Sequence, residues 1–463
     1  MTRRHLLGVL ASSASLAAST NLLRSTYSEP AGKLIGAALA DSSSYDRLAY
    51  LCDRIGNRLS GSEALNKAIA WSLAEMKKDG LANVRSQPVK VPHWVRGQEE
   101  LQLLAPVERK IPMLGLGRSI GTPREGLTAE VVVVSSFEEL DKLPPDSVKG
   151  KIVLYDVPFV SYGETVRYRV AGASRAAALG AVAALVRSVG SASLRTPHTG
   201  GLGYDEKLPK IPAAAVTWED AMMMHRLSNA GEKLRVRLRM DAKTLPDADS
   251  ANVMGEVVGR ELPDEVMVLG GHIDSWDVGQ GAQDDGSGCV AAMEAVKLIH
   301  QLQLKPRRTV RVVLWTNEEN GLAGGTAYRQ MVGGDIEKHV AAIEMDGGAE
   351  APRGFETSVR KPEDLATLRE IGSLLRGIHA QEIALGGGGA DIGPLMRDGV
   401  PGFEVKTVGE RYFDWHHTDA DTVDKIDPAD FRANIAALAV MSYVLADMPG
   451  RLSRVMPEPR RRG

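Results

Sequence analysis

The stretch Val266-Met-Val-Leu-Gly-Gly-His-Ile-Asp274 decides the fold. Its first four residues are uniformly apolar, as in a strand buried on both faces of a sheet, and its last three bring an imidazole and a carboxylate. The same pattern of an apolar run followed by acidic residues recurs downstream. Val310–Trp315 is followed by Glu318-Glu319, and Val340–Ile343 is followed by Glu344-Met-Asp346. Helical patterns separate these apolar runs. The alternation predicts an α/β fold with a mostly parallel or mixed sheet and helices on both faces.

Metal-binding side chains gather where these predicted strands end. Ligands of an open α/β sheet bind outside the carboxyl ends of its strands. Two further polar stretches are Gln283-Asp-Asp-Gly-Ser-Gly288 and Tyr412-Phe-Asp-Trp-His-His-Thr-Asp419. Imidazole and carboxylate donors without cysteine suit zinc in a catalytic setting. Three carboxylates and two histidines could hold two zinc ions with one carboxylate between them, which together generate a hydroxide and polarise a scissile carbonyl.

The adjacent residues Glu318 and Glu319 can take different roles in such a site. Neighbouring side chains that leave a strand point apart, so one carboxylate can bind metal while the other faces the attacking water. The second carboxylate must stay off the metal in order to take a proton from that water and deliver it to the leaving amine. The pattern therefore predicts metal-dependent hydrolysis of an amide bond.

The ordered motifs resemble those of the co-catalytic zinc exopeptidases, and within them the carboxypeptidase Q-like peptidases (plasma glutamate carboxypeptidase), which carry a protease-associated domain. The resemblance covers residues 251–448 and extends more weakly to the helix at Gly61-Ser62. The motifs that carry it are His272-x-Asp274, Asp284-Asp-Gly-Ser-Gly288, Glu318-Glu319, Glu344-x-Asp346 and His417-x-x-x-Asp421.

The resemblance implies a role for each of these residues. The metal ligands would be His272 and Asp346 on one zinc, Glu319 and His417 on the other, and Asp284 as the bridge. Glu318 would be the general acid and base. Asp274 would accept a hydrogen bond from the unligated nitrogen of His272 and fix its tautomer.

Two adjacent histidines compete for one of these positions. His416 and His417 cannot easily serve the same ion. His417 is favoured because it keeps the family's four-residue step to Asp421. His416 would then contact substrate or pack against its neighbours.

Changes of composition along the chain predict its domains. Residues 42–105 and 247–449 form the predicted peptidase domain. Between them, residues 106–246 contain short apolar strands and an Ala-rich helix but no cluster of potential ligands, which predicts a smaller, non-catalytic α/β insert. This insert resembles a protease-associated domain. Residues 450–463 are basic and predict a disordered tail.

Residues 1–25 predict an export signal. Arg3-Arg4 is followed by a short apolar stretch with small residues, which is typical of a twin-arginine signal, although ordinary Sec signals also contain arginine pairs. We therefore expect a periplasmic or secreted protein. The apolar stretch is too short to span a bilayer, and we expect no stable membrane insertion.

Overall composition narrows the classes of partner. The 463 residues carry 56 basic and 59 acidic side chains, and this net charge of −3 argues against binding to nucleic acid. The two cysteines cannot build a disulfide framework. The expected substrate is a small peptide, and the oligomeric state stays open between a monomer and a homodimer.

The predicted activity is that of a zinc-dependent exopeptidase. The likeness to carboxypeptidase Q favours a carboxypeptidase or dipeptidase, whereas other members of the fold are aminopeptidases. Glutaminyl cyclisation on a single zinc is a third and weaker reading, because all five predicted ligands are present. The motifs themselves do not say which peptide terminus is recognised.

Overall fold

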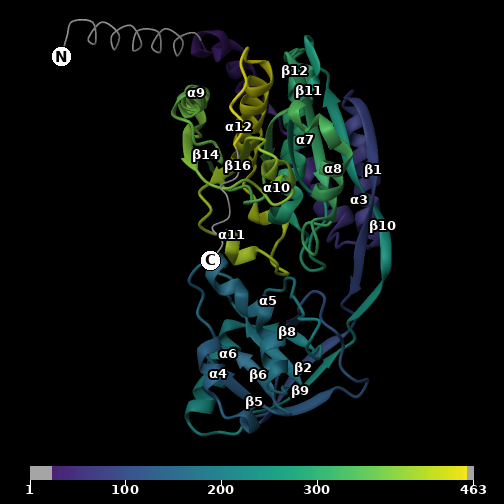
Figure 1. The fold of residues 1–463 in the computed structure, drawn as a ribbon, viewed down its shortest axis with the longest axis vertical. Coiled ribbons are helices and arrows are strands. Elements are labelled where there is room, and N and C mark those ends of the chain that lie inside the picture. The colour runs from purple at the N-terminus through teal and green to yellow at the C-terminus, as the bar shows by residue number, and fades with distance from the viewer. Residues whose placement is uncertain (1–22, 456–463) are drawn as a thin grey trace, which may run out of the picture.

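The computed structural model describes residues 23–455 and arranges them in two domains stacked along the long axis (Figure 1). The larger domain contains an eight-stranded mixed sheet. In spatial order its strands are β1 (Ala82–Val95), β10 (Lys243–Val257), β12 (Arg308–Trp315), β11 (Leu262–His272), β13 (His339–Glu344), β16 (Gly402–Thr407), β14 (Pro352–Thr357) and β15 (Glu382–Leu385). The central strands β12, β11, β13 and β16 are parallel, so their carboxyl ends share one edge of the sheet.

Helices cover both faces of this sheet, which confirms the predicted fold class. The α-helices of the domain are α2 (Ser43–Tyr50), α3 (Glu63–Lys78), α7 (Ser287–Gln301), α8 (Ala323–Val332), α9 (Pro362–Ser373), α10 (Gly393–Arg397), α11 (Tyr412–Trp415) and α12 (Pro428–Asp447). Along β11, Met267 and Leu269 join the core under α7 and α12, while Val266 and Val268 join the core under α8. Burial on both faces explains why the strand is apolar throughout.

Shorter helical turns connect these elements. They are the π-helices η1 (Leu51–Ile55) and η3 (Ala282–Gly286) and the 3-10 helices η4 (Gly333–Lys338), η5 (Arg376–Ile378) and η6 (Val423–Lys425), while the 3-10 helix η2 (Pro145–Ser147) belongs to the smaller domain. Residues 23–40 are also helical. Helix α12 is long and apolar enough to cross a membrane, but 78% of its most apolar stretch is buried inside the fold. It is the central core helix, packed along α7.

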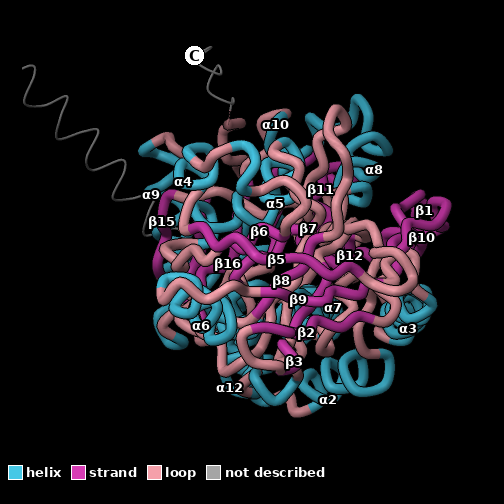
Figure 2. Tube along the Cα trace, turned by 90° about the horizontal axis from the view of Figure 1, so that it is seen from below, coloured by secondary structure: helices cyan, strands magenta, loops and turns pink. Residues whose placement is uncertain are grey.

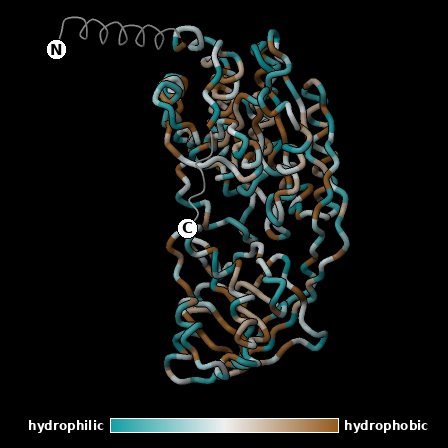
Figure 3. Tube along the Cα trace, in the orientation of Figure 1, coloured by the Kyte–Doolittle hydropathy of each residue, from teal (hydrophilic) through white to brown (hydrophobic). Residues whose placement is uncertain are grey.

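The smaller domain is built on a second eight-stranded sheet. Its spatial order is β3 (Arg109–Ile111), β2 (Glu99–Ala105), β9 (Arg235–Met240), β5 (Leu127–Val134), β6 (Ile152–Tyr155), β7 (Ala183–Arg187), β8 (Ala213–Val216) and β4 (Met113–Gly115). Figure 2 shows helices α4 (Phe137–Lys142) and α5 (Tyr162–Ala178) on one side of these strands and α6 (Trp218–Asn229) on the other. Apolar segments run through the strands of both domains (Figure 3), and each domain has cores of its own.

The boundaries of the inserted domain differ from the predicted residues 106 and 246. Strand β2 precedes residue 106 and pairs with β9 in the second sheet, so the insert begins near residue 99. On the return, β10 already pairs with β1 from Lys243 onward. The break at Pro106 ends a strand of the insert and does not separate the domains. The long β1–β10 ribbon carries the chain down to the insert and back (Figure 1).

The predictions for the two ends of the chain fare differently. The predicted export signal falls almost entirely on residues 1–22, which lie outside the described residues. The predicted disordered tail is wrong for residues 450–455, because these run along the larger domain. Leu452 is buried, Arg454 donates to the carbonyl oxygens of Ile336 and Asp398, and the Val455 amide donates to Gly399.

A buried histidine at the start of β13 makes folding stability sensitive to acid. Tyr328 accepts a hydrogen bond from Arg311 at 2.9 Å, and its hydroxyl donates to Nε2 of His339 at 3.0 Å. Burial and the charge of Arg311 lower the pKa of His339 to about 4, from 6.5 in the unfolded chain. The native state therefore excludes a proton that the unfolded chain binds, so this contribution is present above pH 6.5 and is lost as the pH falls toward 4.

We expect acidification from pH 7.5 to pH 5 to lower the free energy of unfolding by about 2 kcal/mol through His339 alone. Urea unfolding of the wild type and of His339→Gln at both pH values isolates this contribution, because glutamine has no proton to gain and all other groups are shared. An equal loss of stability in the two proteins would contradict the assignment.

Candidate active site

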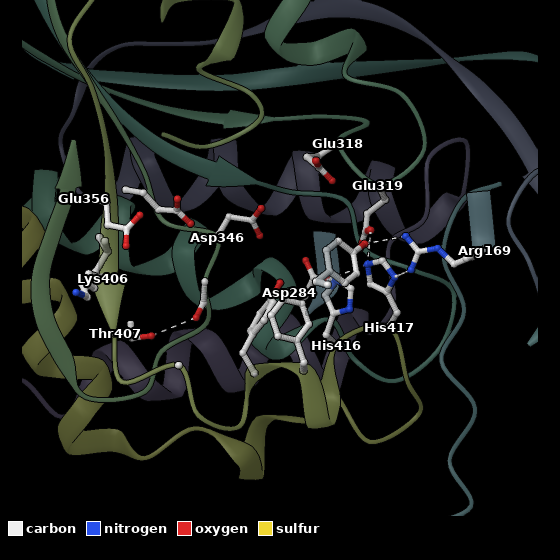
Figure 4. A pocket seen from close by; sticks show the side chains of 17 residues that line it. Arg169, Asp284, Glu318, Glu319, Asp346, Glu356, Lys406, Thr407, His416 and His417 are labelled. Carbon is white, nitrogen blue, oxygen red and sulfur yellow. Dashed lines mark hydrogen bonds and ion pairs between the residues drawn. The ribbon is translucent and has the colours of Figure 1, made fainter. Parts of the chain in front are cut away.

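The predicted ligands come together at the carboxyl edge of the central strands, and Figure 4 shows four of them, Asp284, Glu319, Asp346 and His417, beside one cavity. His272 ends β11, the Glu318-Glu319 pair follows β12, and Asp346 follows β13. Asp284 lies in η3, between β11 and α7, and His417 follows α11. Because β11, β12 and β13 are parallel neighbours, residues far apart in sequence meet at one edge.

The donor atoms form two groups that share Asp284. In the first group, Nε2 of His272 lies 3.1 Å from Oδ1 of Asp284 and 3.2 Å from Oδ1 of Asp346. In the second, Nε2 of His417 lies 3.3 Å from Oδ2 of Asp284 and 3.1 Å from Oε2 of Glu319. The two oxygens of Asp284 thus face different groups, as a bridging carboxylate requires.

His416 lies beside the second group without its full set of contacts. Its Nε2 is 3.6 Å from Oδ2 of Asp284, and its ring stacks on that of His417 with centroids 3.5 Å apart. Its Nδ1 is buried and makes no hydrogen bond within residues 23–455. His416 could complete a three-donor group with Asp284 and His417, but only His417 also contacts Glu319.

Glu318 and Glu319 point in different directions, as predicted, although both lie in the turn after β12 and not in the strand itself. Glu319 turns to His417, and its Oε1 accepts the Trp276 amide at 3.1 Å. Glu318 lines a cavity of about 600 Å³ beside the donor groups. Burial and the nearby charges of Asp346 and Asp284 raise the pKa of Glu318 to about 8. A carboxylate with a raised pKa is a stronger base than an exposed glutamate.

The predicted contact of Asp274 with His272 is wrong in detail. Nδ1 of His272 bonds the backbone oxygen of Asp274 at 2.9 Å, whereas the carboxylate is 3.8 Å away. That carboxylate accepts the Glu318 amide at 3.0 Å and the Ser60 hydroxyl at 3.3 Å. The carbonyl lies closer because it is part of the turn that follows β11. Asp274 thus fixes the tautomer of His272 through its backbone and positions Glu318 through its side chain.

Glycines allow the strand ends to approach Asp285, a carboxylate to which the sequence pattern assigns no role. Asp285 accepts the amides of His272 at 2.9 Å and Gly288 at 3.0 Å. A Cβ atom on Gly271 would lie 2.1 Å from Oδ2 of Asp285, and one on Gly288 would lie 2.4 Å from Oδ1. The Gly-Gly step before His272 is therefore a packing requirement.

Two further side chains hold the loop that carries Asp284. Asp421 accepts the amides of Gln283 at 2.7 Å and Asp284 at 3.3 Å. Arg58 is fully buried and donates to four backbone oxygens, among them Ile273 and Gly281 at 2.8 and 2.9 Å. The spacing to Asp421 is visible in the sequence, whereas nothing in the pattern around Arg58 indicates its burial.

The inserted domain reaches the site, although its sequence contains no cluster of potential ligands. Tyr162 and Arg169 of α5 line the same cavity as Glu318. The Thr199 amide donates to the carbonyl of His417 at 2.9 Å, and Nδ1 of His198 lies 2.8 Å from the carbonyl of His416. His417 has a φ of 63°, which is uncommon outside glycine, and these contacts fix the backbone there. No ligand-type spacing in the sequence points to these residues.

The chemistry of the donor set fits metal cations. Within the described part of the chain, no lysine or arginine forms an ion pair with Asp284, Glu318, Glu319 or Asp346. Burial lowers the pKa of both His416 and His417, which favours the neutral imidazole that binds metal. The carboxylates of Asp346 and Asp284 outweigh burial and raise the pKa of His272, so this group attracts positive charge. Buried carboxylates without lysine or arginine partners, arranged with histidines, are a site for metal cations.

Comparisons with known proteins agree with this geometry. The model of peptidase family M28 matches residues 252–442, and that of the PA domain matches residues 127–224. Carboxypeptidase Q of Bos taurus is 45% identical over 415 residues, which cover 90% of this chain and 88% of that protein. The chain belongs to peptidase family M28. Carboxypeptidase Q of Homo sapiens is also 45% identical, over 90% of this chain and 88% of its own length.

Solved structures extend the comparison to the whole architecture. The crystal structure of a peptidase M28 precursor from Shewanella amazonensis SB2B is 33% identical, with a TM-score of 0.90 over 94% of this chain and 100% of that chain. The zinc aminopeptidase of Bacillus subtilis, at 19% identity and a TM-score of 0.66 over 89% of this chain and 97% of its own, shares the fold. The M28 chain described here is therefore a metallo-exopeptidase with a PA-domain insert, and its activity depends on a metal cofactor.

Proposed function

We propose that this M28 peptidase is an exported carboxypeptidase or dipeptidase that uses two zinc ions to hydrolyse small peptides. The observation that carries the proposal is the pair of donor groups that share Asp284, with Glu318 left free beside them at the cavity. His272 and Asp346 would hold one ion, Glu319 and His417 the other. When bound, the ions would supply Lewis-acid activation of water and carbonyl.

Glu318 moves the proton in this reaction. Its carboxylate accepts a proton from the attacking water, whose oxygen bonds to the carbonyl carbon of the peptide. The same side chain then delivers that proton to the nitrogen of the leaving amine as the carbon–nitrogen bond breaks. The hydrogen bond from the Glu318 amide to Asp274 holds the backbone of this residue while its side chain stays free.

Each finer part of the proposal has its own support. The carboxypeptidase preference rests on the 45% identity to carboxypeptidase Q. Export, to the periplasm or out of the cell, rests on the arginine pair and apolar stretch of residues 1–25. The peptidase likeness supports a small peptide substrate, and the near-neutral charge argues against a nucleic-acid partner. The burial of α12 inside the fold argues against insertion of this helix in a membrane.

Blocked peptides test which terminus is recognised. Zinc-loaded enzyme is incubated with matched dipeptides and tripeptides whose ends are free, N-acetylated or C-amidated, and products are followed by mass spectrometry. We expect amidation to reduce cleavage at least about 100-fold, because a buried site built for a charged group loses several kcal/mol with the neutral analogue. Acetylation is tolerated by a carboxypeptidase and stops a dipeptidase.

Two results would overturn the proposal. Cleavage that is stopped by acetylation alone would make the protein an aminopeptidase. Cyclisation of an N-terminal glutamine, with one zinc ion per chain by elemental analysis, would make it a glutaminyl cyclase. A chelated and re-loaded sample that binds two zinc ions per chain supports the two-group reading independently of activity.

A further inference from the structure

We propose that Tyr162 of the inserted domain is a catalytic residue, whose hydroxyl donates a hydrogen bond to the peptide carbonyl oxygen as negative charge develops on it. Arg169 is the positioning residue behind Tyr162. The inference rests on the proposed peptidase function and adds a group from the second domain to the reaction centre.

The hydrogen bonding of Tyr162 leaves its proton free for a ligand. Nη2 of Arg169 donates to the Tyr162 oxygen at 2.7 Å. Arginine has no acceptor, so the phenol must be the acceptor in this bond. Among the described residues, the Tyr162 hydroxyl makes no other hydrogen bond. Its own proton is therefore available to an acceptor in the cavity that Tyr162 lines.

Arg169 places a positive charge behind this donor without a counter-ion. The side chain is only 6% exposed, and no carboxylate lies within ion-pair distance of it in the described part of the chain. Its Nε makes no hydrogen bond, while Nη1 donates to the Thr199 carbonyl at 3.2 Å. A buried cation of this kind is costly unless negative charge comes near it. An oxyanion bound by Tyr162 would supply that charge during the reaction.

Packing holds the phenol ring beside the donor groups. The Tyr162 ring meets His416 edge to face with centroids 5.1 Å apart, and it stacks on Phe413 at 5.1 Å with an interplanar angle of 19°. Nη1 of Arg169 lies 3.5 Å from Nδ1 of His417. Tyr162 is also the first residue of α5, after the capping residue Ser161. A donor fixed in this way needs little rearrangement when charge develops.

The direction of charge across the cavity agrees with this assignment. The opposite end is lined by Glu356 and Glu404, which face each other across β14 and β16, and by Lys406, whose ammonium is paired with Glu382. These carboxylates would repel a negatively charged oxygen, whereas Arg169 would attract one. Tyr162 with Arg169 behind it is thus the end of the cavity suited to an oxyanion.

The test is Tyr162→Phe in zinc-loaded full-length enzyme. Loss of one oxyanion donor reduces turnover by about 10²–10³-fold in other hydrolases, so we expect kcat to fall by about 100-fold with KM changed less than about threefold. Arg169→Gln removes the charge behind the phenol and is expected to lower kcat by about tenfold. Zinc content and thermal unfolding should stay at wild-type values in both variants.

Tyr168→Phe is the matched control. Tyr168 lies on the same helix and accepts a hydrogen bond from Nη2 of Arg167 at 3.0 Å, but its ring packs in the core of the inserted domain. This variant loses the same kind of bond and should keep its kcat within about twofold.

Binding of inhibitors supplies a second readout. A phosphinic dipeptide mimics the tetrahedral oxyanion, whereas the amino-acid product does not. Measured by calorimetry, the Tyr162→Phe substitution should lower the affinity for the phosphinic dipeptide by about 100-fold and leave the affinity for the amino-acid product unchanged. An unchanged kcat and phosphinic affinity would overturn the proposal.

A different pattern of loss would also overturn it. If Tyr162→Phe raises KM without lowering kcat, and only for peptides with a free C-terminal carboxylate, then Tyr162 binds that carboxylate in the ground state. A wild-type enzyme that cleaves no peptide would overturn the proposed function as well. Normal wild-type cleavage with an unaffected Tyr162→Phe overturns only the role of Tyr162.

Discussion

Glu318→Gln is expected to lower kcat by about 10²–10⁴-fold while both zinc ions stay bound. Glutamine keeps the size of the side chain but cannot accept the proton of the attacking water. The loss should appear equally in kcat and kcat/KM, because the proton moves only on the way to the transition state. Retention of metal is expected because Glu318 makes no contact with the donor groups, whereas Glu319 does.

Glu356→Gln serves as the matched control for this experiment. Glu356 lines the same cavity, so its replacement removes a carboxylate of the same kind without touching the proton path. Steady-state kinetics and elemental analysis are compared for the three proteins. We expect a change of less than about threefold in kcat for the control. Turnover near the wild-type value in Glu318→Gln would remove this residue from its role and leave the metal ligands unaffected.

The fold could be predicted because its signal is local. The uniformly apolar run before His272 occurs only where both faces of a strand are covered, and the structure places its residues alternately in two cores. The ligands follow from the same logic, because parallel strands end at one edge. His272, the Glu318-Glu319 pair and Asp346 therefore meet without any long-range information beyond strand direction.

The contribution of the inserted domain could not be predicted in this way. Tyr162 and Arg169 belong to an amphipathic helix whose buried positions also include Tyr168, and no spacing distinguishes a residue facing the cavity from one in the core. Their approach to His417 depends on the relative placement of two domains joined by the β1–β10 ribbon. Such placement is a tertiary property, set by contacts between residues about 250 positions apart in the sequence.

The contacts of Asp274 show what a sequence motif cannot predict within the site. The sequence gives its distance from His272 along the chain but not the direction of the turn between them. The backbone oxygen occupies the place expected for the carboxylate, which instead holds the amide of Glu318. The His272-x-Asp274 motif therefore places Asp274 in the site correctly, but the contact predicted for its carboxylate is wrong. Arg58 is a similar case, because it is buried among four carbonyls, one at Gly56 and three in the loop between β11 and η3.

Asp284→Asn is expected to have the broadest effect on the site, because this residue is shared by both donor groups. Its Oδ1 faces His272 and its Oδ2 faces His417, at 3.1 and 3.3 Å. Asparagine keeps the shape but removes the charge and replaces one oxygen by an NH₂ group that cannot bind metal. We expect fewer than two zinc ions per chain and a fall in kcat/KM of at least about 10³-fold, since bound metal supplies several kcal/mol of transition-state stabilisation.

Asp419→Asn is the control for the loss of an aspartate in the neighbouring loop, because Asp419 is exposed and lies two residues after His417. It should bind two zinc ions and keep its activity. Elemental analysis across a zinc titration then distinguishes two arrangements. Loss of both ions together from Asp284→Asn means that the groups are coupled through the bridge. Two ions bound with wild-type affinity would contradict a bridging role, and the two groups would then be independent sites that happen to adjoin.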